Sequence, residues 1–186
     1  MNTGITSRQA ILLACRRLVA ERGLPALTTR AVADECGIAL GTLYNYFADK
    51  DELMLAAIES VWQDIFHAAH SAGPGLPFPD YVALLFDTVR RRAAQYPGFL
   101  GAHAVSLARS RRGEARGVMD RTLDHMRAGL LAALRADDAV RPGTFDEDFS
   151  PEAFVQLILD HLLLLLVQGR TDCTALTGLI CRILYR

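Results

Sequence analysis

Residues 28–53 read TTRAVADECGIALGTLYNYFADKDEL, and this stretch decides how the beginning of the chain folds. Ala33, Gly37 and Leu43 have the spacing of a helix-turn-helix. Ala33 supplies the small side chain that is needed where two short helices cross, and Gly37 tolerates the positive φ of the tight turn. Leu43 supplies the apolar anchor on the second helix. The spacing predicts helices over 29–36 and 40–46. Because such triples also arise by chance in helical proteins, the neighbouring residues must carry the functional interpretation.

The side chains around this motif fit a nucleic-acid surface. Threonine, tyrosine and asparagine on a short exposed helix suit phosphates and base edges, and Gly41 lets the backbone approach a duplex. Hydroxyls and free amides at the start of the preceding helix suit a phosphate, as does Lys50 at the start of the next helix. The candidate DNA-binding residues are Thr28, Thr29, Leu40, Gly41, Thr42, Tyr44, Asn45, Tyr46 and Lys50.

The remainder of the chain also has helical periodicity. Its 186 residues are 51% hydrophobic and 22% charged, which is typical of a folded globular protein. Apolar residues recur at spacings of three and four, so we expect an all-α fold of about nine helices. Three prolines make 73–79 a connector. Helices are expected at 7–22, 29–36, 40–46, 50–69, 80–95, 99–108, 111–135, 151–168 and from 172 onward, with a loop at 137–149.

Charge and cysteine content narrow the class of protein. The 20 lysines and arginines are balanced by 21 acidic residues, so any nucleic-acid surface is local. Arginine clusters at 90–92 and 109–116 are interpreted as solvated helix faces. The four cysteines lack C-x-x-C pairing, which favours reduced, buried thiols. No apolar run is long enough for an export signal or a membrane span, and we expect a cytoplasmic protein.

Residues 5–58, and above all residues 28–53, resemble the DNA-binding headpiece of the TetR/AcrR family of bacterial transcriptional regulators. The chain length, the helical remainder and two apolar terminal helices also resemble that family's nine-helix plan. The resemblance implies that Tyr44 and Lys50 contact phosphate and that Gly41, Thr42 and Asn45 face the DNA groove. Leu40 stands where many relatives carry a polar or basic residue, and an apolar side chain there suits a thymine methyl group.

Dimerisation is expected from the headpiece charge. Residues 1–47 hold five arginines and three acidic residues, a local charge of +2, so two headpieces about 34 Å apart are needed for useful affinity. A helix that is apolar on all sides must be buried on all sides. An isologous four-helix bundle formed by two copies of the chain would bury the two terminal helices; the alternative is that both helices fill the core of a monomer. The resemblance implies the same interface. Its candidate residues are Leu162, Leu163, Leu166, Leu176, Leu179, Ile180 and Ile183.

A small-molecule site in the C-terminal body is implied by the resemblance. Apolar walls with a few polar groups suit such a site, although aromatic residues at helical spacing also suit a plain core. His161, beside Asp160 in an apolar helix, is the polar group expected to need a partner. The candidate pocket residues are Trp62, Phe66, Phe86, Phe99, His103, Met126 and His161, and no cofactor is expected.

Catalytic and metal chemistry have less support. Two acid–histidine neighbours, at 124–125 and 160–161, point about 100° apart on a helix and form no relay alone. No phosphate loop or nucleophile motif accompanies them, so we expect no enzyme. His67 and His70, with Asp64 nearby, offer too few ligands for a metal site.

We therefore expect a helix-turn-helix DNA-binding domain at 1–49 and an effector-binding and dimerisation domain at 50–186. The predicted function is that of a ligand-responsive transcriptional regulator, a repressor, that binds a palindromic operator as a homodimer. The alternative is a dimeric DNA-binding module without a small-molecule effector. The expected partners are double-stranded operator DNA, a second copy of the chain and a lipophilic small molecule, with no membrane.

Overall fold

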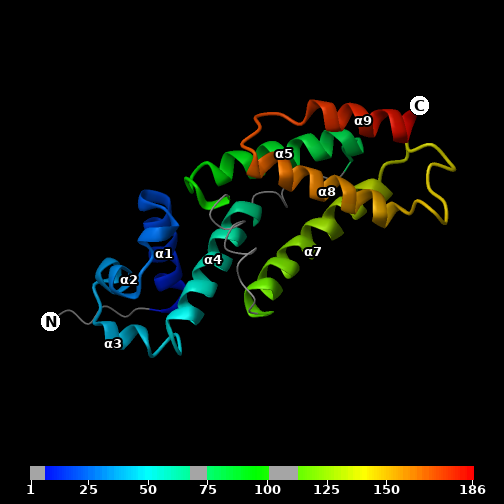
Figure 1. The fold of residues 1–186 in the computed structure, drawn as a ribbon. Helices are drawn as coiled ribbons and strands as arrows, with labels where there is room; N and C mark the ends of the chain where they lie inside the picture. Colours follow the sequence, from blue (N-terminus) through cyan, green and yellow to red (C-terminus); the bar gives the residue numbers. More distant parts are fainter. Residues whose placement is uncertain (1–6, 68–74, 101–112) are drawn as a thin grey trace. The chain divides into compact units, whose positions relative to one another are not determined.

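The computed structural model describes residues 7–67, 75–100 and 113–186, including all side chains there except those of residues 67 and 113–122. Within these ranges the chain forms eight α-helices, one 3-10 helix and no strand, which confirms the all-α class. The predicted helix at 99–108 lies largely outside the described residues. The helices are α1 (Arg8–Arg22), η1 (Leu24–Ala26), α2 (Thr29–Cys36), α3 (Leu40–Leu43), α4 (Lys50–His67), α5 (Phe78–Ala93), α7 (Gly113–Arg135), α8 (Pro151–Val167) and α9 (Thr174–Tyr185), labelled in Figure 1.

The helices belong to two compact units. Met1–Ile65 and Ala93–Met119 make the first, and Phe66–Arg92 and Asp120–Arg186 make the second. The first unit therefore holds α1, α2, α3 and most of α4 (Figure 1). The predicted domain boundary at residues 49 and 50 stays a prediction. None of the helices in the described ranges combines the length and hydropathy needed to cross a membrane.

The first unit is organised around the buried face of α1. Ser7 starts this helix, because its hydroxyl oxygen accepts a 3.1 Å hydrogen bond from the Ala10 amide. The helix ends at Gly23, whose N–H donates to the carbonyl of Val19. Residues spaced by three and four turn inward, as an amphipathic helix requires. The buried residues of α1 are Ile11, Ala14, Cys15, Leu18 and Val19.

The four cysteines are free thiols. Burial, reinforced by the nearby Cys36, raises the pKa of the Cys15 thiol to about 12. Burial also raises the pKa of Cys36, more than the Arg17 guanidinium lowers it. Because the thiolate is the reactive form, Cys15 is an inert core residue.

The second unit packs α5, the C-terminal part of α7, α8 and α9 together. Its core includes Phe78, Leu130, Leu159, Leu162 and Ile180, each no more than 1% exposed. Polar contacts also join α7 to α8: Nε of Arg127 donates to Oε1 of Gln156 at 2.7 Å. Ser150 caps α8 and Pro151 occupies its first turn, so the start predicted from the sequence is confirmed.

The loop between α7 and α8 is held at both ends and in the middle. Asp137 accepts a 2.7 Å hydrogen bond from the Phe78 amide, and the Arg141 amide donates to the carbonyl of Leu184 at 2.9 Å. The ring of Phe145 lies 5.7 Å from that of Phe154 on α8. The loop therefore connects the start of α5, α8 and the end of α9.

Candidate nucleic-acid interface

The turn between α2 and α3 has the geometry that the spacing predicted. Gly37 adopts a left-handed conformation with φ of 65°, where side chains are strained. Its amide donates to the carbonyl of Asp34, and the Ile38 amide donates to that of Ala33 at 3.0 Å. Ala33 is 3% exposed and Leu43 is 1% exposed, so the small and the anchoring side chains both face inward. The predicted helix-turn-helix is confirmed.

The second helix of this motif is shorter than expected. We expected helix over 40–46, whereas α3 ends at Leu43 and the chain continues in tight turns. The amides of Asn45 and Tyr46 donate to carbonyls only three residues back, at 3.2 and 3.1 Å. Tyrosine and asparagine are weaker helix formers than leucine, which favours an early end of the helix. The last turn of a helix often tightens to hydrogen bonds between residues three apart, as it does here.

Side-chain caps fix the starts of the flanking helices. Oγ1 of Thr28 accepts a 3.1 Å hydrogen bond from the Ala31 amide, which starts α2. Asp49 accepts from the Glu52 amide at 2.8 Å, and the Glu52 carboxylate accepts in return from the Ala48 amide at 2.6 Å. This reciprocal cap confirms the predicted start of α4 and sets the backbone position of Lys50.

The candidate DNA-binding residues surround this motif and are mostly solvent-accessible. Leu40 and Tyr44 are 40% and 45% exposed, although each has a large apolar surface. A Cβ added at Gly41 would meet no heavy atom of the described residues within 4 Å. The exposed members of the set are Thr28, Leu40, Gly41, Tyr44, Asn45 and Lys50, and the half-buried members are Thr29, Thr42 and Tyr46.

The candidate pocket residues divide between the two units. In the first unit, Trp62 and Phe99 pack edge to face with their ring centroids 5.2 Å apart. In the second unit, Phe66, Phe86 and Met126 are buried. His161, the polar group expected to need a partner, is exposed on α8, because only one side of that helix faces the core; its role in a pocket stays a prediction. His103 lies outside the described residues.

The candidate dimer residues on α8 and α9 also divide by exposure. Four of them are buried inside the second unit, Leu163 and Ile183 are half-buried, and Leu179 is 52% exposed. Three further exposed residues on α8 are Leu157, Leu164 and Val167, at 60%, 48% and 48%. The four that serve the protomer's own core are Leu162, Leu166, Leu176 and Ile180.

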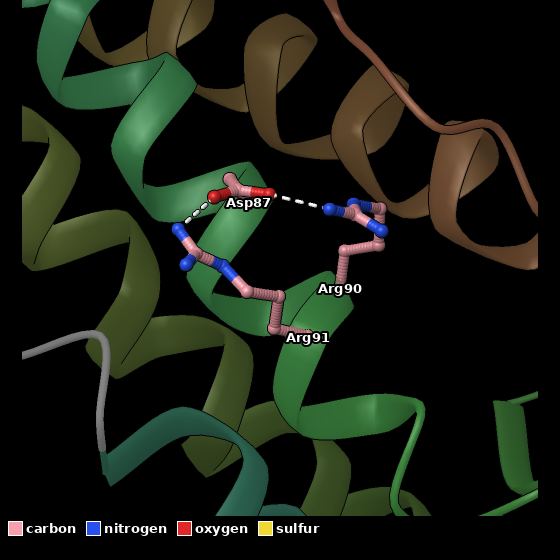
Figure 2. Close-up of polar contacts among 3 residues, drawn as sticks. All are labelled: Asp87, Arg90 and Arg91. Carbon is pink, nitrogen blue, oxygen red and sulfur yellow. Dashed lines mark hydrogen bonds and ion pairs between the residues drawn. The ribbon is translucent and has the colours of Figure 1, made fainter.

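The basic cluster on α5 carries its own counter-ion. Figure 2 shows Asp87 between Arg90 and Arg91, bonded to one guanidinium through each carboxylate oxygen. The hydrogen bond from Arg90, followed by that from Arg91, lowers the pKa of Asp87. This one carboxylate offsets the charge of one of the three arginines at 90–92, and the interpretation of the cluster as a solvated helix face stays a prediction. Residues 109–112 of the other cluster lie outside the described part of the chain.

No set of three or more histidine, cysteine, aspartate or glutamate side chains in the described residues is arranged to hold a metal ion. His70 and the side chain of His67 fall outside that description. Asp64, which the sequence offered only as a neighbour of these histidines, has different partners.

Sequence reasoning missed a polar cluster around Asp64. Its Oδ1 lies 3.1 Å from Nη1 of Arg16 on α1, and its Oδ2 accepts a 2.8 Å hydrogen bond from the Tyr96 hydroxyl. These residues are 48 and 32 positions from Asp64 in the sequence, so no local spacing points to the cluster.

Comparison with known proteins finds a family model that matches the helix-turn-helix segment. Residues 11–57 match the model of the bacterial regulatory proteins of the tetR family. The HTH-type transcriptional regulator UidR of Escherichia coli (strain K12) is 25% identical over 163 residues, covering 83% of this chain and 76% of UidR.

Solved structures share the fold. The multidrug binding protein EbrR, complexed with imidazole, superposes with a TM-score of 0.66 at 22% identity over 96% of this chain and 95% of EbrR. BioQ, solved with its natural double-stranded DNA operator, gives a TM-score of 0.64 at 20% identity over 96% of this chain and 98% of BioQ.

The matched family segment contains the complete helix-turn-helix described above, with its left-handed glycine, its inward-facing anchors and its exposed second helix. The relatives are transcriptional regulators, which agrees with the expectation that this protein is not an enzyme. Residues 11–57 are therefore identified as a DNA-binding domain of the tetR family, and the whole chain is similar to DNA-binding transcriptional regulators that carry this domain.

Proposed function

We propose that this regulator is a repressor that binds a palindromic operator as a homodimer and releases it when a small molecule binds. The observation that carries the DNA-contact part is the open space at Gly41. Inside a helix, glycine costs roughly 0.5–1 kcal/mol relative to alanine. Nothing in the described part of the protomer requires that cost, because an added Cβ would meet none of its atoms and φ is not positive. A duplex that approaches the backbone closely supplies the missing reason.

Phosphate contacts on either side of α3 would orient the headpiece. The Thr28 oxygen accepts a hydrogen bond from the Ala31 amide, which leaves the hydroxyl hydrogen available for a phosphate oxygen. Lys50 is exposed at the first position of α4. Tyr44 offers an exposed phenol between them in sequence. Such contacts position a protein on DNA, whereas base edges are read by groove-facing residues such as Asn45.

The exposed leucines of the second unit support a homodimer. Leu157 and Leu164 are seven residues apart and therefore lie on one side of α8, and Leu179 is exposed on α9. Pairing of this face with its copy would bury all three side chains twice, as an isologous interface does. Two headpieces would then reach half-sites about one helical turn, roughly 34 Å, apart.

The release of DNA in this proposal requires a small-molecule effector that binds the protein. EbrR has the same fold and was solved with imidazole bound, and BioQ was solved with operator DNA, so this fold accommodates both kinds of partner. The edge-to-face packing of Trp62 and Phe99 favours the alternative of a regulator without an effector, because these two rings fill space with each other. Thermal unfolding with candidate lipophilic compounds distinguishes the two, since binding to the folded state raises Tm.

Selection of genomic fragments by the purified protein tests operator binding. A bound site with two inverted half-sites is expected, and a reporter behind that promoter should be expressed less when the protein is present. Replacing both Tyr44 and Lys50 by alanine should weaken binding to all duplexes and flatten its salt dependence. Asn45→Ala should instead change the sequence preference. Equal losses on every sequence from Asn45→Ala would contradict a base-reading role.

A further inference from the structure

Asp64 connects three segments of the first unit. One carboxylate oxygen pairs with Arg16 on α1. The other accepts a hydrogen bond from the hydroxyl of Tyr96, which lies in the turn after α5. The Arg16 and Asp64 side chains are 27% and 15% exposed, and Tyr96 is buried. This partial burial reduces solvent screening, so both contacts are stronger than those of a fully exposed ion pair.

The turn that carries Tyr96 is held by its own geometry. The Phe99 amide donates to the carbonyl of Tyr96 at 3.1 Å and closes a four-residue turn. Pro97 at the second position and Gly98, with φ of 73° at the third, fit a type II turn. The Tyr96 hydroxyl is therefore presented to Asp64 from a constrained backbone.

The same turn adjoins an aromatic pair. The ring centroid of Phe99 lies 6.2 Å from that of Tyr96 and 5.2 Å from that of Trp62. Trp62 precedes Asp64 by two residues on α4. A change in packing at Trp62 or Phe99 therefore reaches the Tyr96 hydroxyl, and through Asp64 the guanidinium of Arg16, by direct contacts alone.

We propose that Asp64 is a positioning residue for DNA binding: it fixes α1, and the helix-turn-helix packed on it, against α4 and makes that orientation depend on Tyr96. The inference rests on the proposed operator binding. α1 packs against α2, and Arg17, next to Arg16, also pairs with Glu35 of α2 at 3.0 Å, so the two helices move together. Loss of either contact to Asp64 lets α1 sample more orientations. A smaller fraction of molecules then holds the headpiece as DNA requires, and the apparent Kd rises.

Tyr96→Phe tests this with minimal disturbance, because it removes one hydroxyl far along the chain from the helix-turn-helix. We expect the operator Kd to rise on the order of fivefold, the scale of a modest coupling between sites, with an unchanged circular dichroism spectrum. Asp64→Asn should raise Kd at least as much, and adding Tyr96→Phe to it should cause little further change, because both act through one carboxylate.

Tyr185→Phe is the matched control, because it removes the same hydroxyl-to-carboxylate hydrogen bond in the second unit. It should lower Tm and leave the operator Kd unchanged. If Tyr96→Phe also leaves Kd unchanged, or lowers it, the positioning role of Asp64 is refuted even though the wild type binds DNA. If the wild type binds no genomic duplex, the operator-binding proposal itself fails.

Trp62 supplies a second readout, because it is the single tryptophan of the chain. Coupling is reciprocal, so saturation with operator should change Trp62 emission, whereas an unrelated duplex should not. In Asp64→Asn the change should be lost at DNA concentrations that still saturate the variant. Emission that responds equally in wild type and Asp64→Asn would contradict a path through Asp64.

Discussion

The Tyr185 hydroxyl near the C-terminus donates a hydrogen bond to Asp137, two residues beyond the end of α7. The same carboxylate oxygen accepts the Phe78 amide, and the other accepts the Ala139 amide at 3.0 Å. Burial raises the pKa of Asp137, but the hydrogen bonds from Tyr185, Phe78 and Ala139 together outweigh it, so the pKa lies below its usual value of 3.8. The ionised form of Asp137 therefore stabilises the second unit.

Asp137 should make the stability of the second unit sensitive to acid. Because the pKa of Asp137 is lower in the folded than in the unfolded protein, its ionised carboxylate stabilises the folded state above about pH 4. This stabilisation is lost as the pH falls through the folded-state pKa. Tyr185→Phe should lower the free energy of unfolding by about 1.5–3 kcal/mol at neutral pH, the scale of a hydrogen bond to a charged group. Urea unfolding across pH measures this difference, which should shrink in acid. A difference that is constant with pH would show that Asp137 is not the partner that matters.

Gly41→Ala should separate folding from DNA binding. The added methyl group enters open space and improves helix propensity, so Tm should stay the same or rise, whereas operator affinity should fall. Gly37→Ala gives the opposite pattern, because its positive φ makes any side chain strained and Tm should fall. Gel-shift titrations and thermal unfolding of both variants provide the measurement. Full operator affinity in Gly41→Ala would remove the main support for a close approach of DNA.

Leu40 should read a thymine methyl group. It is 40% exposed at the first position of α3, beside the open backbone of Gly41. Replacing thymine by deoxyuridine at the contacted position removes one methyl group, worth about 0.8 kcal/mol or roughly a fourfold change in Kd. Leu40→Ala should make the protein indifferent to that replacement. If the deoxyuridine scan affects wild type and Leu40→Ala equally, Leu40 does not contact the methyl group.

Leu179→Glu should convert the proposed dimer to a monomer, because it places one charge from each protomer in the proposed α8–α9 interface. Leu13→Glu is the matched control, since Leu13 is also a leucine about half exposed, at 46%, but lies on α1. Sedimentation velocity at several concentrations should distinguish the two variants. A Leu179→Glu protein that sediments like the wild-type dimer would place the interface elsewhere.

Local chemistry made the helix-turn-helix predictable. Each feature that shapes this motif acts within a few residues, so the spacing alone specifies the backbone. These features are Ala33 where the helices cross, Gly37 with its positive φ, the buried Leu43 and the Asp49 cap at the start of α4. The end of α3 was less predictable, because the apolar pattern continues to Phe47 while the hydrogen bonds tighten after Leu43.

The amino-acid sequence by itself determined the helical class, the DNA-binding motif and the start of α8, because periodicity, turn residues and caps are properties of neighbouring residues. Only the tertiary structure decided which side of α8 is buried, where His161 points and what Asp64 binds. These depend on partners that are distant in the chain, since a helix with leucines on every side does not specify which of them faces the core.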